Sequence, residues 1–346
     1  MKNKNMKLIG LALASLMVPF CVSCNANKDN DKLNIVTTIF PEYDWVMNIL
    51  GEKKDNANVT LLLDNGVDLH SYQPTPKDIV TISKCDLFIY VGGESDEWVE
   101  NALKQATNKN LKAINLMETL GDAVKEEEVV EGMEGEEHDH DHEHEGEEDH
   151  DHEEGEEHDH DHEDEEEVEY DEHVWLSLKN AEVIVKEIGK SIAAIDKDNA
   201  SYYEGNVTSY VNSLKDLDTR YAQAVEAGSK KTVLFADRFP FRYLVDDYNL
   251  KYYAAFVGCS AETEASFETI KFLANKVDEL GLSVILKIES SDGSIANTVK
   301  NATTNKNQTI MTMDSIQSAS TKEYKDGRNY ISIMEQNLTV LKEAVK

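Results

Sequence analysis

Cysteine and proline are rare in this chain, which has 4 cysteines and 5 prolines among its 346 residues. Cys21 and Cys24 lie close to the N-terminus, so Cys85 and Cys259 form the one internal pair in the sequence. A single disulfide between them is therefore the most that the interior can contain, and spacing alone does not establish it. Cys85 lies in the apolar segment KCDLFIYV and is expected to pack as a small buried hydrophobe.

Lys and Arg are absent from residues 126–172, where 29 of the residues are Asp or Glu. The whole chain has a formal net charge of −34, so this stretch supplies −29 and the rest of the chain only −5. The acidity therefore belongs to one insert and not to the fold. It excludes nucleic acid as a partner, because nucleic acid binding requires clustered Lys and Arg.

Sequence motifs of hydrolases are also missing. We find no HExxH, no GxSxG and no pair of carboxylates at a fixed helical spacing, which are patterns that indicate hydrolytic chemistry. We therefore predict that the protein is not an enzyme. A secreted metal-dependent hydrolase is a weaker alternative, because catalytic zinc keeps an open coordination position.

Histidine is scarce outside residues 135–163, a stretch that repeats one phrase as GEEHDHDHE, GEEDHDHEE and GEEHDHDHE. These repeats contain almost nothing apolar to bury, so we expect the loop over residues 126–169 to be disordered. Imidazoles and carboxylates both bind borderline metals, so the loop is expected to hold several divalent cations weakly; a solvated acidic tract is the plainer alternative. The histidines of the loop are His138, His140, His142, His144, His150, His152, His158, His160 and His162.

The N-terminus has the pattern of a targeting signal. Three lysines within the first seven residues precede the apolar run LIGLALASLMVPFCV, which is too short to span a bilayer comfortably. The pattern resembles a bacterial lipoprotein signal over residues 1–23, followed by a polar tether over residues 24–32. This resemblance implies cleavage before Cys24, a lipid on Cys24, and a protein anchored outside the bacterial cell membrane. An ordinary secretory signal is the alternative.

Short β-branched runs alternate with helical stretches from Leu33 onward. The predicted strands are LNIVTTIF, NVTLLL, DLFIYVGG and KAINL in the first half, and TVLFAD, KYYAAFV, LSVILKIES and NQTIMTM in the second. Such alternation predicts mostly parallel sheets with helices on both faces. Because the length favours two domains, we predict an α/β protein with two lobes, each built on a mostly parallel four-stranded sheet.

One long helix is expected to join the lobes. The helical pattern runs from Ala200 to Ala227 without a proline, which corresponds to about 42 Å at 1.5 Å per residue. A flexible hinge would instead be rich in Gly and Ser, so the connector should be rigid. We predict an N-terminal lobe over residues 33–176, helices including this linker over 177–228, and a C-terminal lobe over 229–346.

The two histidines outside the loop are candidate metal ligands. His70 follows the second predicted strand, and His173 lies where the acidic loop ends and a helix begins at Ser177. Asp314 follows the last predicted strand. Ligands of open α/β sheets bind outside the carboxyl ends of the strands, where such loops converge. Two imidazoles and a carboxylate suit zinc or manganese, so we predict a site formed by His70, His173 and Asp314.

From about Leu33 to its end the chain resembles the zinc- and manganese-binding solute-binding proteins of bacterial ABC importers, in particular the zinc-specific branch with a His-rich acidic loop. The matching segments are VDLHSYQPTPKD, DEHVWLSLKNA, DNASYYEGN, the position of Asp314 and YISIMEQNLTVL. The resemblance implies two lobes joined by a rigid helix, Zn2+ or else Mn2+ as the transported ligand, an ABC permease as partner, and a monomer.

One position departs from this resemblance. The family usually has a histidine or glutamate after the first strand of the second lobe, where this chain has Ala236 in TVLFADRFPFRYLVDDY. Ala236 has no metal-binding group, so another ligand must take this role. The candidates are Asp237, Cys259, Glu262 and Glu289, besides a water or a loop histidine.

These patterns predict an extracytoplasmic receptor that captures Zn2+ in a cleft between two lobes and delivers it to an importer. A metal buffer or chaperone that acts through the His-rich loop is the alternative. The receptor should have one tight site, whereas the buffer should have several weak sites and no tight one.

Overall fold

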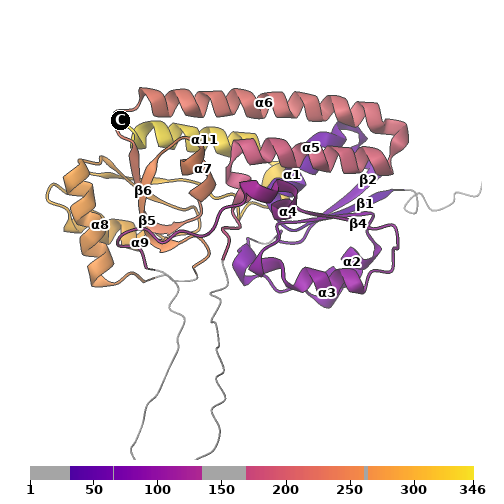
Figure 1. The fold of residues 1–346 in the computed structure, drawn as a ribbon, viewed down its shortest axis with the longest axis horizontal. Helices are drawn as coiled ribbons and strands as arrows, with labels where there is room; N and C mark the ends of the chain where they lie inside the picture. Colours follow the sequence, from indigo (N-terminus) through magenta and orange to yellow (C-terminus); the bar gives the residue numbers. More distant parts are fainter. Residues whose placement is uncertain (1–31, 65, 135–168, 261–263) are drawn as a thin grey trace, which may run out of the picture. The chain divides into compact units, whose positions relative to one another are not determined.

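The computed structural model describes residues 32–64, 66–134, 169–260 and 264–346. The predicted signal with Cys24, the nine loop histidines and Glu262 lie outside the described residues, and their roles stay predictions. Leu33–Lys346 form one compact unit, and Figure 1 shows that this unit contains two sheets with their helices.

Each sheet has four strands, and all strand pairs are parallel. The first sheet has the order β2-β1-β3-β4, with β1 (Leu33–Thr37), β2 (Ala57–Leu61), β3 (Leu87–Tyr90) and β4 (Lys112–Asn115). The second has the order β6-β5-β7-β8, with β5 (Thr232–Phe239), β6 (Lys251–Val257), β7 (Val284–Lys287) and β8 (Thr309–Thr312). The predicted fold class of two parallel α/β lobes is confirmed.

The helices of the first lobe are α1 (Phe40–Leu50), α2 (Pro76–Lys84), α3 (Trp98–Lys104) and α4 (Leu116–Leu120). Those of the second are α7 (Arg242–Asp247), α8 (Phe267–Leu280), α9 (Ser294–Ala302) and α10 (Thr321–Lys325). Helix α2 begins with Pro76 in its first turn, and Thr75 and Asp78 form a capping box. The five-residue helices α4 and α10 are too short for their periodicity to predict them.

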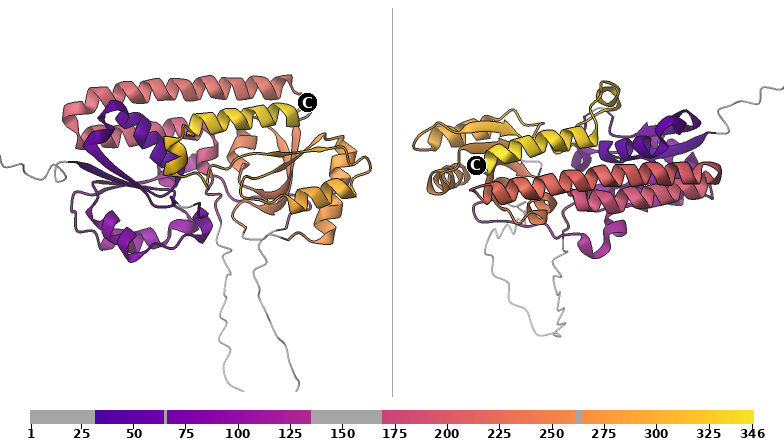
Figure 2. Two further views of the ribbon diagram at one scale, coloured as in Figure 1. Left: turned by 180° about the vertical axis from the view of Figure 1, so that it is seen from behind. Right: turned by 90° about the horizontal axis from the view of Figure 1, so that it is seen from above.

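Helix α6 (Ala200–Ala227) extends along both lobes, with α5 (Leu178–Ile195) beside it over the first lobe and α11 (Tyr330–Ala344) beside it toward the second (Figures 1 and 2). The 28-residue helix α6 has the predicted bounds and packs against α5, α1 and α11. A Cβ atom at Gly189 of α5 would lie 2.2 Å from Cγ2 of Val207 on α6, so the close approach of these helices depends on glycine. The Tyr221 hydroxyl of α6 donates to the Met334 carbonyl of α11 at 2.6 Å. The predicted long connector is therefore a packed helix.

The described ends of the acidic loop are held by backbone hydrogen bonds. The Glu127 N–H donates to the Glu169 carbonyl at 2.9 Å, and the Glu134 N–H donates to the Ala255 carbonyl of β6 at 2.9 Å. The sequence predicts disorder from residue 126 onward, whereas residues 126–134 run to the second sheet and bond to its edge strand. Composition did not reveal this, because the backbone bonds leave no side-chain signal. The acidic side chains also find partners far along the chain: Glu128 accepts the Tyr252 hydroxyl at 3.0 Å, and Glu134 accepts the Ser266 N–H at 2.8 Å.

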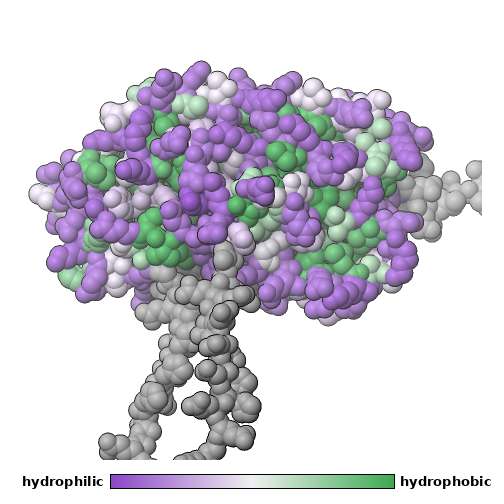
Figure 3. Space-filling model, in the orientation of Figure 1, coloured by the Kyte–Doolittle hydropathy of each residue, from purple (hydrophilic) through white to green (hydrophobic). Residues whose placement is uncertain are grey.

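Hydrophilic side chains predominate on the face of the molecule drawn in Figure 3, and apolar side chains there form smaller separate groups. The large apolar side chains are instead internal, and Trp45, Trp175 and Tyr221 are fully buried. Among the helices of the described ranges, none is both long and apolar enough to cross a membrane.

Candidate metal centre

The predicted ligands His70 and His173 lie next to each other. His70 is part of the short 3-10 helix η3 (Leu69–Ser71), where its N–H donates to the Asp68 carboxylate at 3.1 Å. His173 immediately precedes a second 3-10 helix, η6 (Val174–Leu176), and is fully buried. The two Nε2 atoms are 3.2 Å apart. Two nitrogens bound to one tetrahedral zinc ion at bond lengths of about 2.0–2.1 Å lie about 3.3–3.4 Å apart, so this pair has the spacing of two ligands of one ion.

The second ring nitrogen of each histidine has a partner. His70 Nδ1 lies 2.9 Å from the Ser95 hydroxyl and 3.4 Å from a Glu172 carboxylate oxygen. His173 Nδ1 lies 3.0 Å from the Asp171 carboxylate. In the tautomer in which each Nδ1–H donates to these acceptors, each Nε2 keeps its lone pair for a metal, which is the usual arrangement behind metal-binding histidines.

The carboxylates beside the histidines favour a cation. Burial opposes ionisation of Glu172, but hydrogen bonds with His70 and Ser95 outweigh it and lower the pKa of Glu172. Burial likewise opposes ionisation of Asp68, but the positive charge of Arg238, with hydrogen bonds from Arg238 and from the His70 N–H, lowers the pKa of Asp68 below its ordinary value. Both groups are thus held as anions near the paired imidazoles.

Cys259 is the third potential ligand at this place. Within the described ranges, His70, His173 and Cys259 form a group whose ligand atoms all lie within 4.8 Å of one another. Cys259 follows Gly258, where a Cβ atom would lie 3.0 Å from Cε1 of His173; the glycine lets this loop approach the imidazole. Cys259 and Cys85 are both free thiols, so the disulfide that the sequence allows is not formed.

The structure does not bring Asp314 into this group. Its carboxylate pairs with Arg328 and accepts the Ile316 N–H at 2.8 Å. Burial, followed by the negative charge of Glu289, raises the pKa of Asp314, although Arg328 opposes this shift. Asp314 would have to leave Arg328 to bind a metal, so its role as a ligand stays a prediction.

The other predicted candidates on the second lobe also have protein partners. Ala236 is buried in the core of the second sheet. Asp237 accepts the Ile288 N–H at 3.2 Å, and burial raises the pKa of Asp237. Glu289 accepts both the N–H and the hydroxyl of Ser315 at 2.8 Å. None of these side chains belongs to the group formed by the described histidines and cysteine.

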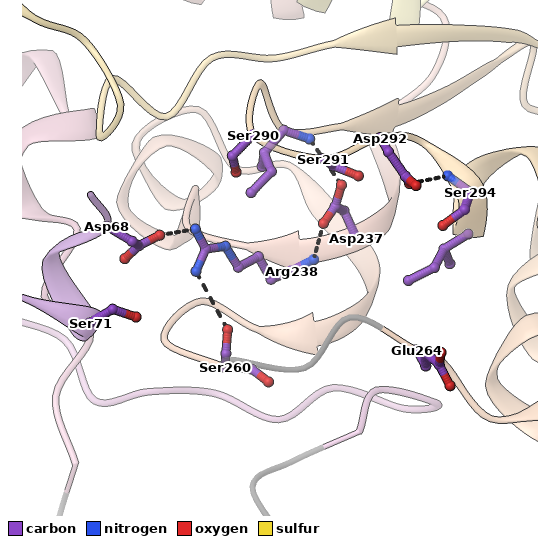
Figure 4. A pocket seen from close by; sticks show the side chains of 12 residues that line it. Asp68, Ser71, Asp237, Arg238, Ser260, Glu264, Ser290, Ser291, Asp292 and Ser294 are labelled. Carbon is purple, nitrogen blue, oxygen red and sulfur yellow. Dashed lines mark hydrogen bonds and ion pairs between the residues drawn. The ribbon is translucent and has the colours of Figure 1, made fainter. Parts of the chain in front are cut away.

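Arg238 of β5 lines the same cavity as His70. Its guanidinium pairs with Asp68 and donates to the Ser260 carbonyl at 3.5 Å (Figure 4). Arg238 lines a cavity of about 340 Å³ together with His70 and Cys259, and also an adjacent, serine-rich cavity of about 590 Å³ that Figure 4 shows. A guanidinium has no lone pair to offer a metal. Arg238 therefore supplies no ligand at this place but a fixed positive charge, which the Asp68 carboxylate balances.

Sequence reasoning missed the groups that orient the histidines. Asp171 and Glu172 directly precede His173, but they are indistinguishable from the acidic run before them. Ser95 has no local signal because it reaches His70 from a turn 25 residues away. Gln317 also contacts the site: when its amide nitrogen faces the Asp68 carboxylate, its oxygen lies 2.9 Å from His173 Nε2.

The fold and the site define a two-lobed binding protein of the rigid-helix class. Two parallel α/β lobes are bridged by one long packed helix, and the paired histidines lie at the carboxyl ends of their strands. The chain belongs to the family described as ZnuA, zinc-uptake complex component A, periplasmic, whose model matches residues 35–344. The family resemblance seen in the sequence is confirmed.

Two relatives cover almost the whole chain. The zinc-binding lipoprotein AdcA of Streptococcus pneumoniae is 34% identical over 343 residues, which are 98% of this chain and 61% of AdcA; the chain thus spans less than two thirds of that relative. The high-affinity zinc uptake system protein ZnuA of Bacillus subtilis is 33% identical over 342 residues, which are 98% of this chain and 97% of that protein.

Solved structures show the same fold. The Zn(II)-bound ZnuA-like domain of Streptococcus pneumoniae AdcA has a TM-score of 0.66 at 28% identity, covering 91% of this chain and 99% of that domain. The metal-dependent lipoprotein YcdH from Bacillus subtilis has a TM-score of 0.68 at 27% identity, with coverage of 91% and 99%.

Proposed function

We propose that this chain is an extracytoplasmic binding protein that captures Zn2+ between its lobes and delivers it to an ABC importer. The observation that carries the proposal is the 3.2 Å separation of the Nε2 atoms of His70 and His173, with the other nitrogen of each ring held by a hydrogen-bond partner. The relatives support it, since their names describe zinc binding and zinc uptake and not an enzymatic reaction.

The proposal assigns His70 and His173 as ligands of the transported ion. Asp314 would join them only in a state in which Arg328 releases its carboxylate. The protein would act as a monomer, anchored to the bacterial cell membrane by a lipid on Cys24, with the permease of an importer as its partner. Mn2+ is the competing cargo, because imidazole and carboxylate ligands also suit it.

Capture and release would proceed through small adjustments of loops and not through a wide hinge. Helix α6 packs on α1, α5 and α11 along its length, so bending it would break many apolar contacts at once. The two histidines instead lie on short turns outside the strands, where small backbone changes cost less.

To test the proposal, the chain without residues 1–24 is titrated with Zn2+ and with Mn2+ in competition with a chelator of known affinity. Three variants of this chain are titrated beside it. They are His70→Ala, a deletion of residues 136–163, and a variant that keeps the whole loop but has its nine histidines replaced by glutamine. The deletion begins after Glu134 because that residue bonds to the Ala255 carbonyl and the Ser266 N–H. The glutamine chain is the matched control, because it keeps the length and carboxylates of the loop.

We expect one tight zinc site in the chain, in the deletion variant and in the glutamine chain, and its loss in His70→Ala. If binding is weak throughout and disappears when the loop histidines are removed, the receptor function is wrong and the loop is a metal buffer. If Mn2+ binds more tightly than Zn2+ at the site that needs His70, the assignment of the cargo is wrong.

A further inference from the structure

Two neutral imidazoles are a small ligand set for the tight capture of a dication. Structural zinc sites have four ligands, and catalytic sites have three protein ligands besides water. The second lobe therefore has to offer a donor close to the histidine pair. Ala236 is buried in the core, and Arg238, which pairs with Asp68 and lines the cavity with His70, has no lone pair to offer.

Geometry singles out one donor. Asp237, Glu289 and Asp314 each accept hydrogen bonds from neighbouring backbone N–H groups and are absent from the described group around the histidines. The ligand atom of Cys259, in contrast, lies within 4.8 Å of the ligand atoms of both His70 and His173. The same thiol and His70 line one cavity, so an ion entering that cavity meets both, and the buried His173 Nε2 lies 3.2 Å behind His70 Nε2.

We propose that Cys259 is the third protein ligand of the captured ion and that its sulfur makes the site selective for Zn2+ over Mn2+. This inference rests on the proposed function and names a donor that replaces the missing side chain at position 236. Binding would break the S–H bond of Cys259, release the proton to solvent and form a zinc–thiolate bond, so no oxidation or reduction is involved.

The required movement is small. In a tetrahedral site with Zn–S at about 2.3 Å and Zn–N at about 2.0–2.1 Å, sulfur and nitrogen lie about 3.6 Å apart. From a separation of at most 4.8 Å, the thiol has to move by roughly 1 Å at most to complete the site. A cysteine rotamer change or a slight shift of the loop after β6 is sufficient, and Gly258 leaves room for that shift beside the His173 ring.

The chemical consequence is metal selectivity. Thiolate ligands favour zinc and other soft or borderline ions, whereas manganese prefers carboxylate, carbonyl and water ligands. A site with two imidazoles and a carboxylate would distinguish the two ions less strongly. The thiolate also adds a negative charge beside the ion, where Arg238 alone would add a positive one.

The direct test uses Co2+ as a spectroscopic probe of the chain without residues 1–24, with the nine loop histidines replaced by glutamine. A cobalt–thiolate bond gives a charge-transfer band in the near ultraviolet, and tetrahedral Co2+ gives intense visible bands. We expect one equivalent of Co2+ to produce both, and Zn2+ to remove both. Cys85→Ala is the matched control, because Cys85 is a buried thiol of the first lobe within the cluster of Val36, Ile82 and Phe88; it should leave the spectrum unchanged.

Variants at position 259 then measure selectivity. Cys259→Ser should remove the charge-transfer band, weaken Zn2+ binding about tenfold or more and leave Mn2+ binding within about twofold. Cys259→His should remove the charge-transfer band but recover tight Zn2+ binding, since it restores an imidazole. The thermal unfolding midpoint of each metal-free variant shows whether that variant folds. The Co2+ spectrum of the chain that keeps Cys259 tests the thiolate ligand without relying on any substitution at position 259.

The outcomes separate this inference from the proposed function. Tight Zn2+ binding that requires His70, without a thiolate band and unchanged by Cys259→Ser, would overturn the inference and leave the receptor function intact. Absence of any tight site in the unsubstituted chain would overturn both. A thiolate band with equal loss of Zn2+ and Mn2+ binding in Cys259→Ser would support the ligand and overturn its role in selectivity.

Discussion

Asp171 is the residue whose replacement most directly tests the geometry behind His173. Its carboxylate lies 3.0 Å from His173 Nδ1 and accepts the N–H of the same residue at 2.8 Å. The backbone of Asp171 is held independently, because its carbonyl accepts the Tyr243 hydroxyl at 2.7 Å. Asp171→Asn therefore removes a negative charge behind the imidazole while leaving the loop in place.

The expected loss can be worked out from these contacts. A carboxylate that accepts Nδ1–H raises the basicity of the imidazole and fixes its tautomer, and replacing such a partner typically costs 10–100-fold in metal affinity. We expect Asp171→Asn to weaken Zn2+ binding by about 10–100-fold, which corresponds to about 1.4–2.7 kcal/mol of binding free energy. The amide still accepts the backbone N–H, so the stability of the metal-free protein should change by less than about 1 kcal/mol.

The assay is a competition titration with a chromogenic zinc chelator, combined with urea unfolding of the metal-free protein. Asp196→Asn is the matched control: that carboxylate accepts the Tyr203 hydroxyl at 2.6 Å at the turn between α5 and α6, where the substitution should leave zinc affinity unchanged. A change of zinc affinity of less than twofold in a folded Asp171→Asn variant would refute the assigned role of Asp171.

Three further predictions concern packing and pH. Gly258→Ala should weaken zinc binding at least about fivefold in the same competition assay, because the new Cβ would lie 3.0 Å from the His173 ring; unchanged affinity would mean that the loop moves freely. Gly189→Ala should lower the free energy of unfolding by about 1–3 kcal/mol, because it overpacks α5 against α6. Gly205→Ala places no atom within 4 Å of its new Cβ and should raise the free energy of unfolding by up to about 1 kcal/mol. Equal effects of the two substitutions in urea unfolding would contradict the close packing of α5 on α6 at Gly189. Burial, together with the negative charge of Asp96, raises the pKa of Glu42 from 4.5 to about 8. The folded state therefore holds this proton more tightly, and the resulting stability is full below pH 4.5 and is lost as the pH rises through 8, at about 1.4 kcal/mol per pH unit. Burial also raises the pKa values of Asp44 and Asp96 to about 7, so Glu42→Gln should reduce the slope of stability between pH 5 and 8 by about 1.4 kcal/mol per pH unit without abolishing it; an identical slope in both proteins would exclude Glu42 as a source.

Periodicity and scarcity explain why much of the fold and the histidine pair could be predicted. The strands are short β-branched runs separated by helical stretches, and a strand–helix alternation has few arrangements other than a parallel sheet. His70 and His173 stood out because the other nine histidines lie in one repeat. Both histidines follow the pattern that places ligands in loops outside the strands, and the structure puts their Nε2 atoms 3.2 Å apart.

The donors from the second lobe could not be predicted in the same way. Strand β5 has an irregular register between Phe235 and Arg238 in its pairing with β6, and such an irregularity changes which side chains point toward the site. The resemblance to the family pointed to Ala236, whereas the side chain of β5 that reaches Asp68 is that of Arg238. The partner of Asp314 was equally hidden, because the ion pair with Arg328 depends on how the chain folds back after β8.

We predict that the acidic loop has a kinetic role, separate from affinity, because its described ends lie at the cavity. Glu127 and Glu169, at its two described ends, line the same cavity as His70 and Cys259. Weak sites tethered at that opening would raise the local concentration of Zn2+ and so its rate of entry, but they cannot change the free energy of the ion once it has reached the histidines. The dissociation constant of the tight site should therefore be the same with and without residues 136–163, while the rate of capture at scarce zinc should fall when these residues are removed. A loop that altered the dissociation constant would instead have to contribute a ligand to the site itself.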